Sequence, residues 1–213
     1  MTLILESEEP TLSFYPLAIA ALLTASSLAA STQATAETDE SERPAIILDG
    51  GEGEAIAFPL HSTHRLAFAS SNEAGMSFFE IRVPARSAAA PPHRHSHEDE
   101  FFYVRQGRVT FLADGKRKTI DAGGFVLLPR DGWHAVWNAG DEEATLLVGT
   151  SAGQFDDFFD AVAMDVANAG ELPPPEMGEI VARLASERGV SIDMNRVPDD
   201  ARALYGLPSV ESD

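Results

Sequence analysis

The chain has 213 residues, of which 44% are hydrophobic, and its formal net charge at pH 7 is -19. This length suits one domain with extensions, and the apolar fraction is sufficient for a folded core. The negative charge would repel phosphate-rich partners, so we expect no nucleic-acid ligand and interpret the acidity as a contribution to solubility. The sequence contains no cysteine, which excludes disulfides and thiolate metal sites and leaves nitrogen and oxygen ligands.

The N-terminal segment has several features of a secretory signal. Residues 12–30 are apolar and uncharged, and Ala34-Thr35-Ala36 has the small-x-small form of a signal-peptidase site. The glutamates that precede the apolar run stand where a signal peptide has basic residues. We expect residues 1–36 to be a signal peptide of a secreted or periplasmic protein. An uncleaved membrane anchor, or a buried helix of a cytoplasmic protein, stays open as an alternative.

From residue 44 onward, short apolar runs alternate with glycine and proline, after a polar linker at 37–43. Asp114-Gly115 is a two-residue hairpin signal, because glycine accepts the positive φ that such a turn needs. So many short strands within 44–150 predict an all-β sandwich or barrel. The runs that we expect to be strands are 45–48, 55–58, 64–69, 76–83, 101–104, 108–112, 117–120, 125–128, 134–138 and 145–150.

Beyond residue 150 the apolar residues recur at helical spacing. Two such groups flank the break at Leu172-Pro173-Pro174-Pro175: Phe155, Phe158, Phe159 and Val162, then Ile180, Val181, Leu184 and Ala185. We expect residues 151–213 to be a C-terminal extension with two amphipathic helices, packed on the barrel or against a partner subunit. The phenylalanines are expected to be core rather than a cofactor site, and residues 193–198 and 204–208 to be an irregular tail.

Two stretches of the β region carry candidate metal ligands. His93 and His95 are two residues apart, so in an extended segment both imidazoles point to the same face. Glu100 follows five residues after His95, which leaves room for a bend that returns a carboxylate to that face. His134 lies in a later strand-like run and is the candidate for the other half of the site. Imidazole and carboxylate ligands suit a divalent transition metal, and Fe, Mn, Ni, Co, Cu and Zn all stay open.

These two stretches resemble the paired motifs of the cupin superfamily. The first motif, His-x-His, Glu and Gly, is matched by His93, His95, Glu100 and Gly107, and the second, Gly, Pro, His and Asn, by Gly123, Pro129, His134 and Asn138. One departure is the turn glycine, Gly132, which lies one position later than usual. The resemblance implies that 44–150 form a cupin jelly-roll β-barrel and that His93, His95, Glu100 and His134 hold one metal ion.

The run from Pro91 to Val104 and the phenylalanine-rich helix resemble single-domain, quercetin 2,3-dioxygenase-like cupins. That resemblance implies a metal-dependent dioxygenase that oxidatively cleaves a flavonol or similar enolisable aromatic substrate with dioxygen. Glu100 would be the catalytic residue that accepts the proton of a substrate hydroxyl, for which a dry pocket must raise its pKa. The alternative is a metal cupin that is not an oxygenase, either an isomerase or a protein that binds a sugar or another small ligand. A homodimer is the default expectation.

Other histidines and acids near the motifs have less specific expectations. His97 is interpreted either as a residue behind the ligands or as a solvated loop histidine. Glu98 and Asp99 are expected to be acids at the rim of the site. His61 and His64 precede the motifs, and we expect both to be structural.

Overall fold

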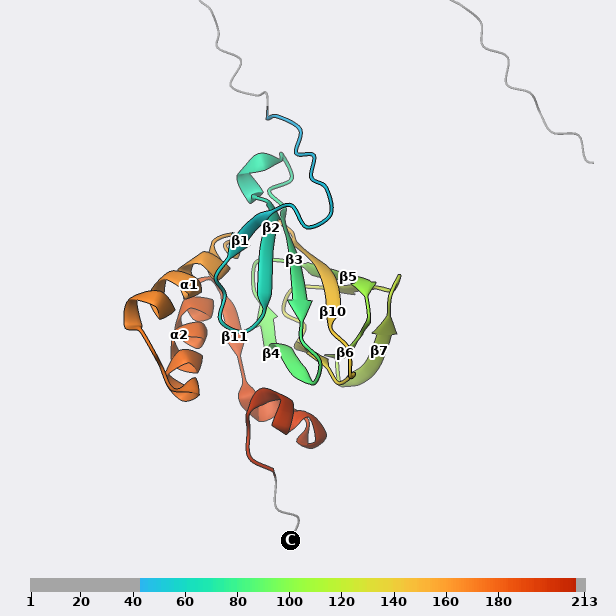
Figure 1. The fold of residues 1–213 in the computed structure, drawn as a ribbon, viewed down its shortest axis with the longest axis vertical. Helices are drawn as coiled ribbons and strands as arrows, with labels where there is room; N and C mark the ends of the chain where they lie inside the picture. The colour runs from blue at the N-terminus through green and yellow to red at the C-terminus, as the bar shows by residue number, and fades with distance from the viewer. Residues whose placement is uncertain (1–42, 210–213) are drawn as a thin grey trace, which may run out of the picture. The chain divides into compact units, whose positions relative to one another are not determined.

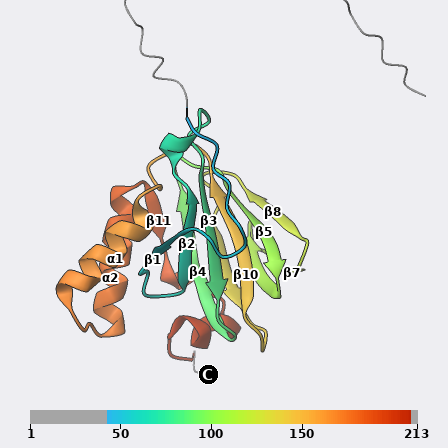
Figure 2. The ribbon, with the colours of Figure 1, turned by 45° about the horizontal axis from the view of Figure 1, so that its top comes forward.

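The computed structural model describes residues 43–209, so the expected signal segment at 1–36 lies outside the described residues. Within them, two antiparallel sheets face each other and share one hydrophobic core. Two α-helices lie beside this barrel, near β1 and β11 (Figure 1, Figure 2). The prediction of an all-β jelly roll with C-terminal α-helices is confirmed.

The strands fall into a six-stranded and a five-stranded sheet. The first has the order β1 (Glu54–Ile56), β2 (Ser62–Ala67), β3 (Ser77–Val83), β10 (Ala144–Thr150), β5 (Glu100–Gln106) and β8 (Phe125–Leu128). The second has the order β11 (Val190–Ile192), β4 (Ser87–His95), β9 (His134–Asn138), β6 (Arg108–Ala113) and β7 (Lys116–Asp121). A short 3-10 helix, η1 (Ala69–Ser71), lies between β2 and β3.

The predicted hairpin between β6 and β7 is confirmed. Ala113 pairs with Lys116 across the turn, and Asp114 and Gly115 have φ values of 50° and 71°. Positive φ at both central residues is the conformation that suits the twist of a two-residue hairpin.

One expected strand is absent, and one strand of the barrel was not expected. Residues 45–48 form no strand, and Ile47 is 87% exposed, so this apolar run has no sheet to join. In contrast, β4 is a nine-residue strand that the strand pattern did not indicate, because Pro91 and Pro92 cannot donate to a ladder. The structure accommodates both prolines through register shifts between β4 and β9.

The C-terminal extension contains the two expected helices, α1 (Phe158–Ala169) and α2 (Pro174–Glu187). Phe158 and Phe159 of α1, like Val181 and Leu184 of α2, belong to the same core as the barrel strands, as expected. Among residues 43–209, neither helix has the length and apolar character that crossing a bilayer requires.

The last part of the chain is more regular than the expected irregular tail. After α2, β11 pairs antiparallel with β4, and the 3-10 helices η2 (Met194–Arg196) and η3 (Asp199–Tyr205) follow. The hydroxyl of Tyr205 donates to the backbone oxygens of Ala90 and Val136 at 3.0 and 3.2 Å. These contacts fasten the end of the chain to β4 and β9, which carry most of the candidate ligands.

Candidate metal centre

The structure brings the four candidate ligands together inside the barrel. His93 and His95 lie at the end of β4, Glu100 begins β5, and His134 begins β9. In the β4–β9 ladder His93 is directly opposite His134. All four side chains are buried, and one nitrogen or oxygen atom from each lies within 4.8 Å of the others.

Strand alternation explains the inward orientation of these residues. In β5, Glu100, Phe102 and Val104 are buried while Tyr103 and Arg105 are exposed, as a period of two requires. In β9 every residue is buried, because Ala135 and Trp137 on the second face are covered by Val197 and Ala201 from the C-terminal extension.

Backbone and carboxylate acceptors orient the three imidazoles. His93 Nδ1 lies 2.8 Å from the oxygen of Pro91, and His134 Nδ1 lies 3.0 Å from that of Gly132. A carbonyl oxygen only accepts, so each Nδ1 carries the proton and each Nε2 presents a lone pair. His95 Nδ1 faces Glu98 Oε2 at 3.2 Å, which leads to the same tautomer.

The Nε2 atoms converge on the carboxylate of Glu100. His134 Nε2 lies 3.0 Å from His93 Nε2 and 3.0 Å from Glu100 Oε2. Glu100 Oε2 is also 3.7 Å from His93 Nε2 and 3.8 Å from His95 Nε2. Among the residues that the structure describes, the buried His95 Nε2 has no hydrogen-bond partner.

This donor set fits a metal ion. Lone pairs that face one another at such distances repel unless a positive charge lies between them. Two ligand atoms roughly 2.1 Å from a shared cation are separated by roughly 3.0–3.4 Å at angles of about 90–110°, which matches the shorter distances of the cluster. The buried group of three histidines and one glutamate can therefore hold a divalent transition metal.

Burial and mutual contacts shift the pKa values of the cluster. Burial, together with the neighbouring His134, lowers the pKa of His93 from 6.5 to about 4. Burial alone would raise the pKa of Glu100, but its contacts with the imidazoles of His134 and His93 outweigh that effect and hold the pKa well below its ordinary value. The expectation that the pocket raises the pKa of Glu100 is wrong, since the imidazoles stabilise the carboxylate more than desolvation destabilises it.

Glu98 is not the rim acid that we expected, because its side chain is 1% exposed. One carboxylate oxygen accepts from the backbone N–H of Gln154 and the other faces His95 Nδ1. Burial opposes the charged forms of both groups, yet this contact raises the pKa of His95 and lowers that of Glu98. Glu98 is therefore placed behind the cluster, where it fixes the ring of His95.

The remaining motif residues shape the backbone. Gly107 has a φ of 72°, and a Cβ there would lie 2.8 Å from the oxygen of Glu143. Asn138 donates its amide to the oxygens of Val83, Pro84 and Glu142. Where the turn glycine of the second motif is displaced, Asp131 adopts the left-handed φ of 65° instead, and its backbone N–H donates to the backbone oxygen of His95 at 2.7 Å.

Three of the less specific candidates lie outside the cluster. His97 is exposed, which favours the solvated reading of that residue. Asp99 accepts from the guanidinium of Arg130 at 3.1 Å on the surface, in keeping with a rim position. His64 is partly buried in β2 and is not among the residues that line the cavity beside the cluster.

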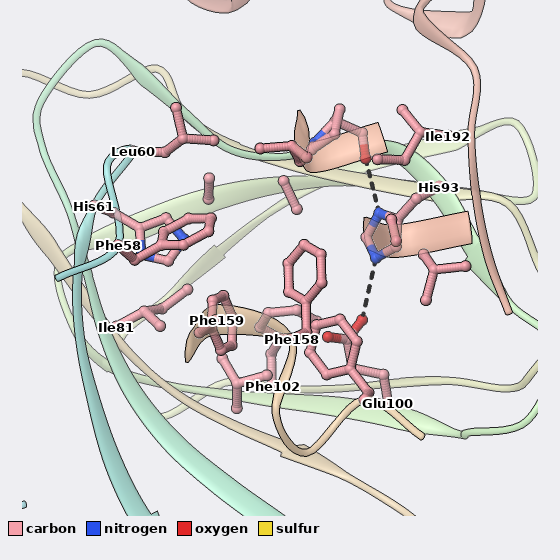
Figure 3. Close-up of a pocket in the computed structure, with 18 residues that line it drawn as sticks. Phe58, Leu60, His61, Ile81, His93, Glu100, Phe102, Phe158, Phe159 and Ile192 are labelled. Carbon is pink, nitrogen blue, oxygen red and sulfur yellow. Dashed lines mark hydrogen bonds and ion pairs between the residues drawn. The ribbon is translucent and has the colours of Figure 1, made fainter. Parts of the chain in front are cut away.

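A cavity of about 70 Å³ adjoins the cluster, between the two sheets and the C-terminal extension (Figure 3). Its polar side chains are His93 and Glu100 at one end and His61 at the other, and no lysine or arginine is among its lining residues. The extension contributes seven apolar lining residues: Phe155, Phe158, Phe159, Val181, Ala185, Val190 and Ile192. The phenylalanines are thus both core and cavity wall, a role that helical spacing alone did not reveal.

Comparison with known proteins gives a family match in the centre of the barrel. Residues 79–149 match the cupin domain family. Quercetin 2,3-dioxygenase of Bacillus subtilis is 26% identical over 114 residues, which cover 53% of this chain and 33% of that protein. The chain thus spans about a third of the length of this relative.

Solved structures with similar folds have low sequence identity. KdgF from Halomonas sp. is 16% identical, with a TM-score of 0.40 over 44% of this chain and 82% of that one. A predicted oxalate decarboxylase from Thermotoga maritima is 22% identical, with a TM-score of 0.41 over 43% and 80% of the two chains. A sugar phosphate isomerase from Silicibacter pomeroyi is 23% identical, with a TM-score of 0.40 over 46% and 63%. The family match at 79–149 runs from β3 to β10 of the two-sheet barrel, so this central part of the chain is similar to cupin domains.

Proposed function

We propose that this chain is a metal-dependent dioxygenase that oxidatively cleaves a small, enolisable aromatic compound. The observation that carries the proposal is a buried group of three histidines and one glutamate at the end of an apolar cavity. The match to the Bacillus subtilis dioxygenase supports the same reaction class. Both atoms of dioxygen enter the product of such a cleavage, so the reaction needs no external reductant.

His93, His95, Glu100 and His134 would hold the metal, since their donor atoms face one another in the deprotonated state that a metal requires. A divalent cation, when bound, supplies positive charge that acidifies a substrate hydroxyl. Glu100 stays ionised and accepts the hydrogen bond of that hydroxyl. Because the pKa of Glu100 is low, it takes the proton only from a hydroxyl that has become strongly acidic.

The cavity lining favours an apolar, uncharged ring over a sugar phosphate. A phosphate group is bound by arginine, lysine or backbone N–H groups, and the lining residues include no cationic side chain. Phe102, Phe155 and Phe158 instead offer aromatic faces next to the cluster. This composition argues against the sugar-processing alternative.

The size of the cavity favours a one-ring substrate over a flavonol. Pockets for drug-sized ligands are usually about 300–1,000 Å³, whereas this cavity measures about 70 Å³. A substrate larger than this cavity therefore has to displace some of the lining residues. We expect the affinity to be higher for a compound that requires the smaller displacement.

Oxygen consumption tests the proposal. The full chain, loaded in turn with Fe, Mn, Ni, Co, Cu or Zn, is mixed with benzoylacetone or quercetin in an oxygen electrode. We expect uptake with at least one redox-active metal, a ring-containing cleavage product, and loss of uptake in Glu100→Gln at matched metal content. Absence of uptake with every metal would remove the dioxygenase, and a compound that stabilises the protein yet is recovered unchanged would favour a binding protein.

A further inference from the structure

His61 lies in the cavity at the end opposite His93 and Glu100 (Figure 3). It directly precedes β2, and its side chain is 8% exposed. All other polar side chains of the lining belong to the candidate metal cluster. His61 is therefore the one polar group in the part of the cavity that the cluster does not occupy.

One nitrogen of His61 has a partner and the other does not. Nδ1 lies 3.0 Å from Thr63 Oγ1, which fixes the ring, while among residues 43–209 Nε2 makes no hydrogen bond. Burial lowers the pKa of His61 from 6.5 to about 4, and nearby backbone carbonyls offset only part of this effect. The ring is neutral at physiological pH, and because His61 lines the cavity, its Nε2 is available to a hydrogen-bonding group of a ligand.

Aromatic rings connect His61 to the metal end of the cavity, where His93 and Glu100 lie. The His61 ring centroid is 4.8 Å from Phe58 and 6.0 Å from Phe159. Phe159 lies 5.5 Å from Phe155, which in turn lies 4.9 Å from His95. Between the two polar ends there is thus a wall of rings, which suits the flat body of an aromatic molecule.

We propose that His61 is a specificity-determining residue whose Nε2 hydrogen-bonds a hydroxyl group at the end of the substrate remote from the metal. The inference rests on the proposed function and narrows its substrate class to enolisable aromatic compounds with a hydroxyl on the ring. A hydroxyl donates and accepts, so it satisfies Nε2 in either tautomer of the imidazole.

Binding to the zinc-loaded full chain tests this, because zinc has no redox chemistry and the readout does not depend on turnover. Calorimetry compares benzoylacetone with its para-hydroxy analogue. We expect wild type to bind the hydroxylated compound about 10-fold more tightly, the size of one hydrogen bond in a dry site. His61→Phe should lose this preference, and His61→Gln, which keeps a hydrogen-bonding group, should retain part of it.

His64→Phe is the matched control, since His64 lies in β2, three residues after His61, but outside the cavity lining, and it should keep the wild-type preference. Equal affinities in wild type, or an unchanged preference in folded His61→Phe, would overturn the inference. Failure of both compounds to bind would overturn it together with the proposed substrate class. If the protein binds the hydroxylated compound more tightly but consumes no oxygen, the role of His61 stands and only the proposed dioxygenase activity is ruled out.

Discussion

The two ends of the cavity are built in different ways. At the metal end, the candidate histidine ligands from β4 and β9 are held by hydrogen bonds to backbone carbonyls and to Glu98. At the far end, where His61 lies, Phe58 from the segment before β2 and Phe159 from α1 pack around this histidine with few polar contacts. The barrel strands thus supply the four candidate metal ligands, whereas segments outside them supply His61 and most of the aromatic rings around it.

Loss of a ligand should have the largest effect, and only at the metal end. We expect His134→Ala to abolish metal retention, because it removes the imidazole whose Nε2 lies 3.0 Å from both His93 and Glu100. The metal content of purified protein, measured by elemental analysis, checks this. His97→Ala is the control, as His97 is exposed, and its metal content should be close to that of wild type. Equal losses in both variants would mean that the ligand set is wrong.

Truncation of the aromatic wall should instead destabilise the fold. Phe159 is 7% exposed and contacts the rings of Phe58, Phe79, Phe155 and Phe158. We expect Phe159→Ala to lower the free energy of unfolding by about 3–5 kcal/mol, as measured by denaturant titration. Met164→Ala on the same helix, where the side chain is 61% exposed, should change it by less than about 0.5 kcal/mol. Similar values for the two would contradict the packing of α1 on the barrel.

Acidification should lower the free energy of unfolding through protonation of His61. Because the pKa of His61 falls from 6.5 to about 4 on folding, the unfolded chain binds the additional proton between these values. Neutral His61 therefore contributes stability that is present above about pH 6.5 and is lost as the pH falls toward 4. The loss amounts to about 3 kcal/mol.

His61→Phe carries no such group, so its free energy of unfolding should fall less than that of wild type between neutral pH and pH 4. Denaturant titrations at several pH values measure the difference, and the titration of the metal cluster is common to both proteins. Parallel pH profiles would show that His61 is not desolvated.

The smallest effect should come from Glu98→Gln, which keeps the shape of the side chain but removes its charge. Glutamine can still hydrogen-bond His95 Nδ1, but it stabilises that ring less than a carboxylate does. We expect metal affinity to fall by roughly 10- to 100-fold, as measured by competition with a chelator. Asp99→Asn is the control, since Asp99 contacts the exposed Arg130. Unchanged affinity in Glu98→Gln would remove its role in orienting His95.

The positions of His93, His95 and Glu100 were predictable from the sequence because their relative geometry is local, whereas His134 was identified through the second motif. The period of two in a strand places His93 and His95 on one face, and the spacing to Glu100 allows one bend. The position of Glu98 was not predictable in this way. Its carboxylate accepts from Gln154, 56 residues away, and a side chain at Gly153 would clash with it.

The far end depends on contacts that spacing does not encode. Nothing in the local pattern of His61 distinguishes a cavity residue from a structural one, because its surroundings come from α1 and from Phe58. Likewise, one of the two strands that pair with β4 is β11, which lies about a hundred positions later and pairs Val190 with His95 and Ile192 with His93. Helical periodicity identified α1 and α2 but not the faces that they cover.

The pairing of β11 with β4 covers the outer edge of the strand that bears His93 and His95. In a chain cut after α2, the strand that bears His93 and His95 would become a bare sheet margin with unpaired amides and carbonyls, open to the same strand of a second molecule. With β11 in place, this margin of the sheet ends in a strand of only three residues, and a short edge strand is a poor template for pairing with another chain.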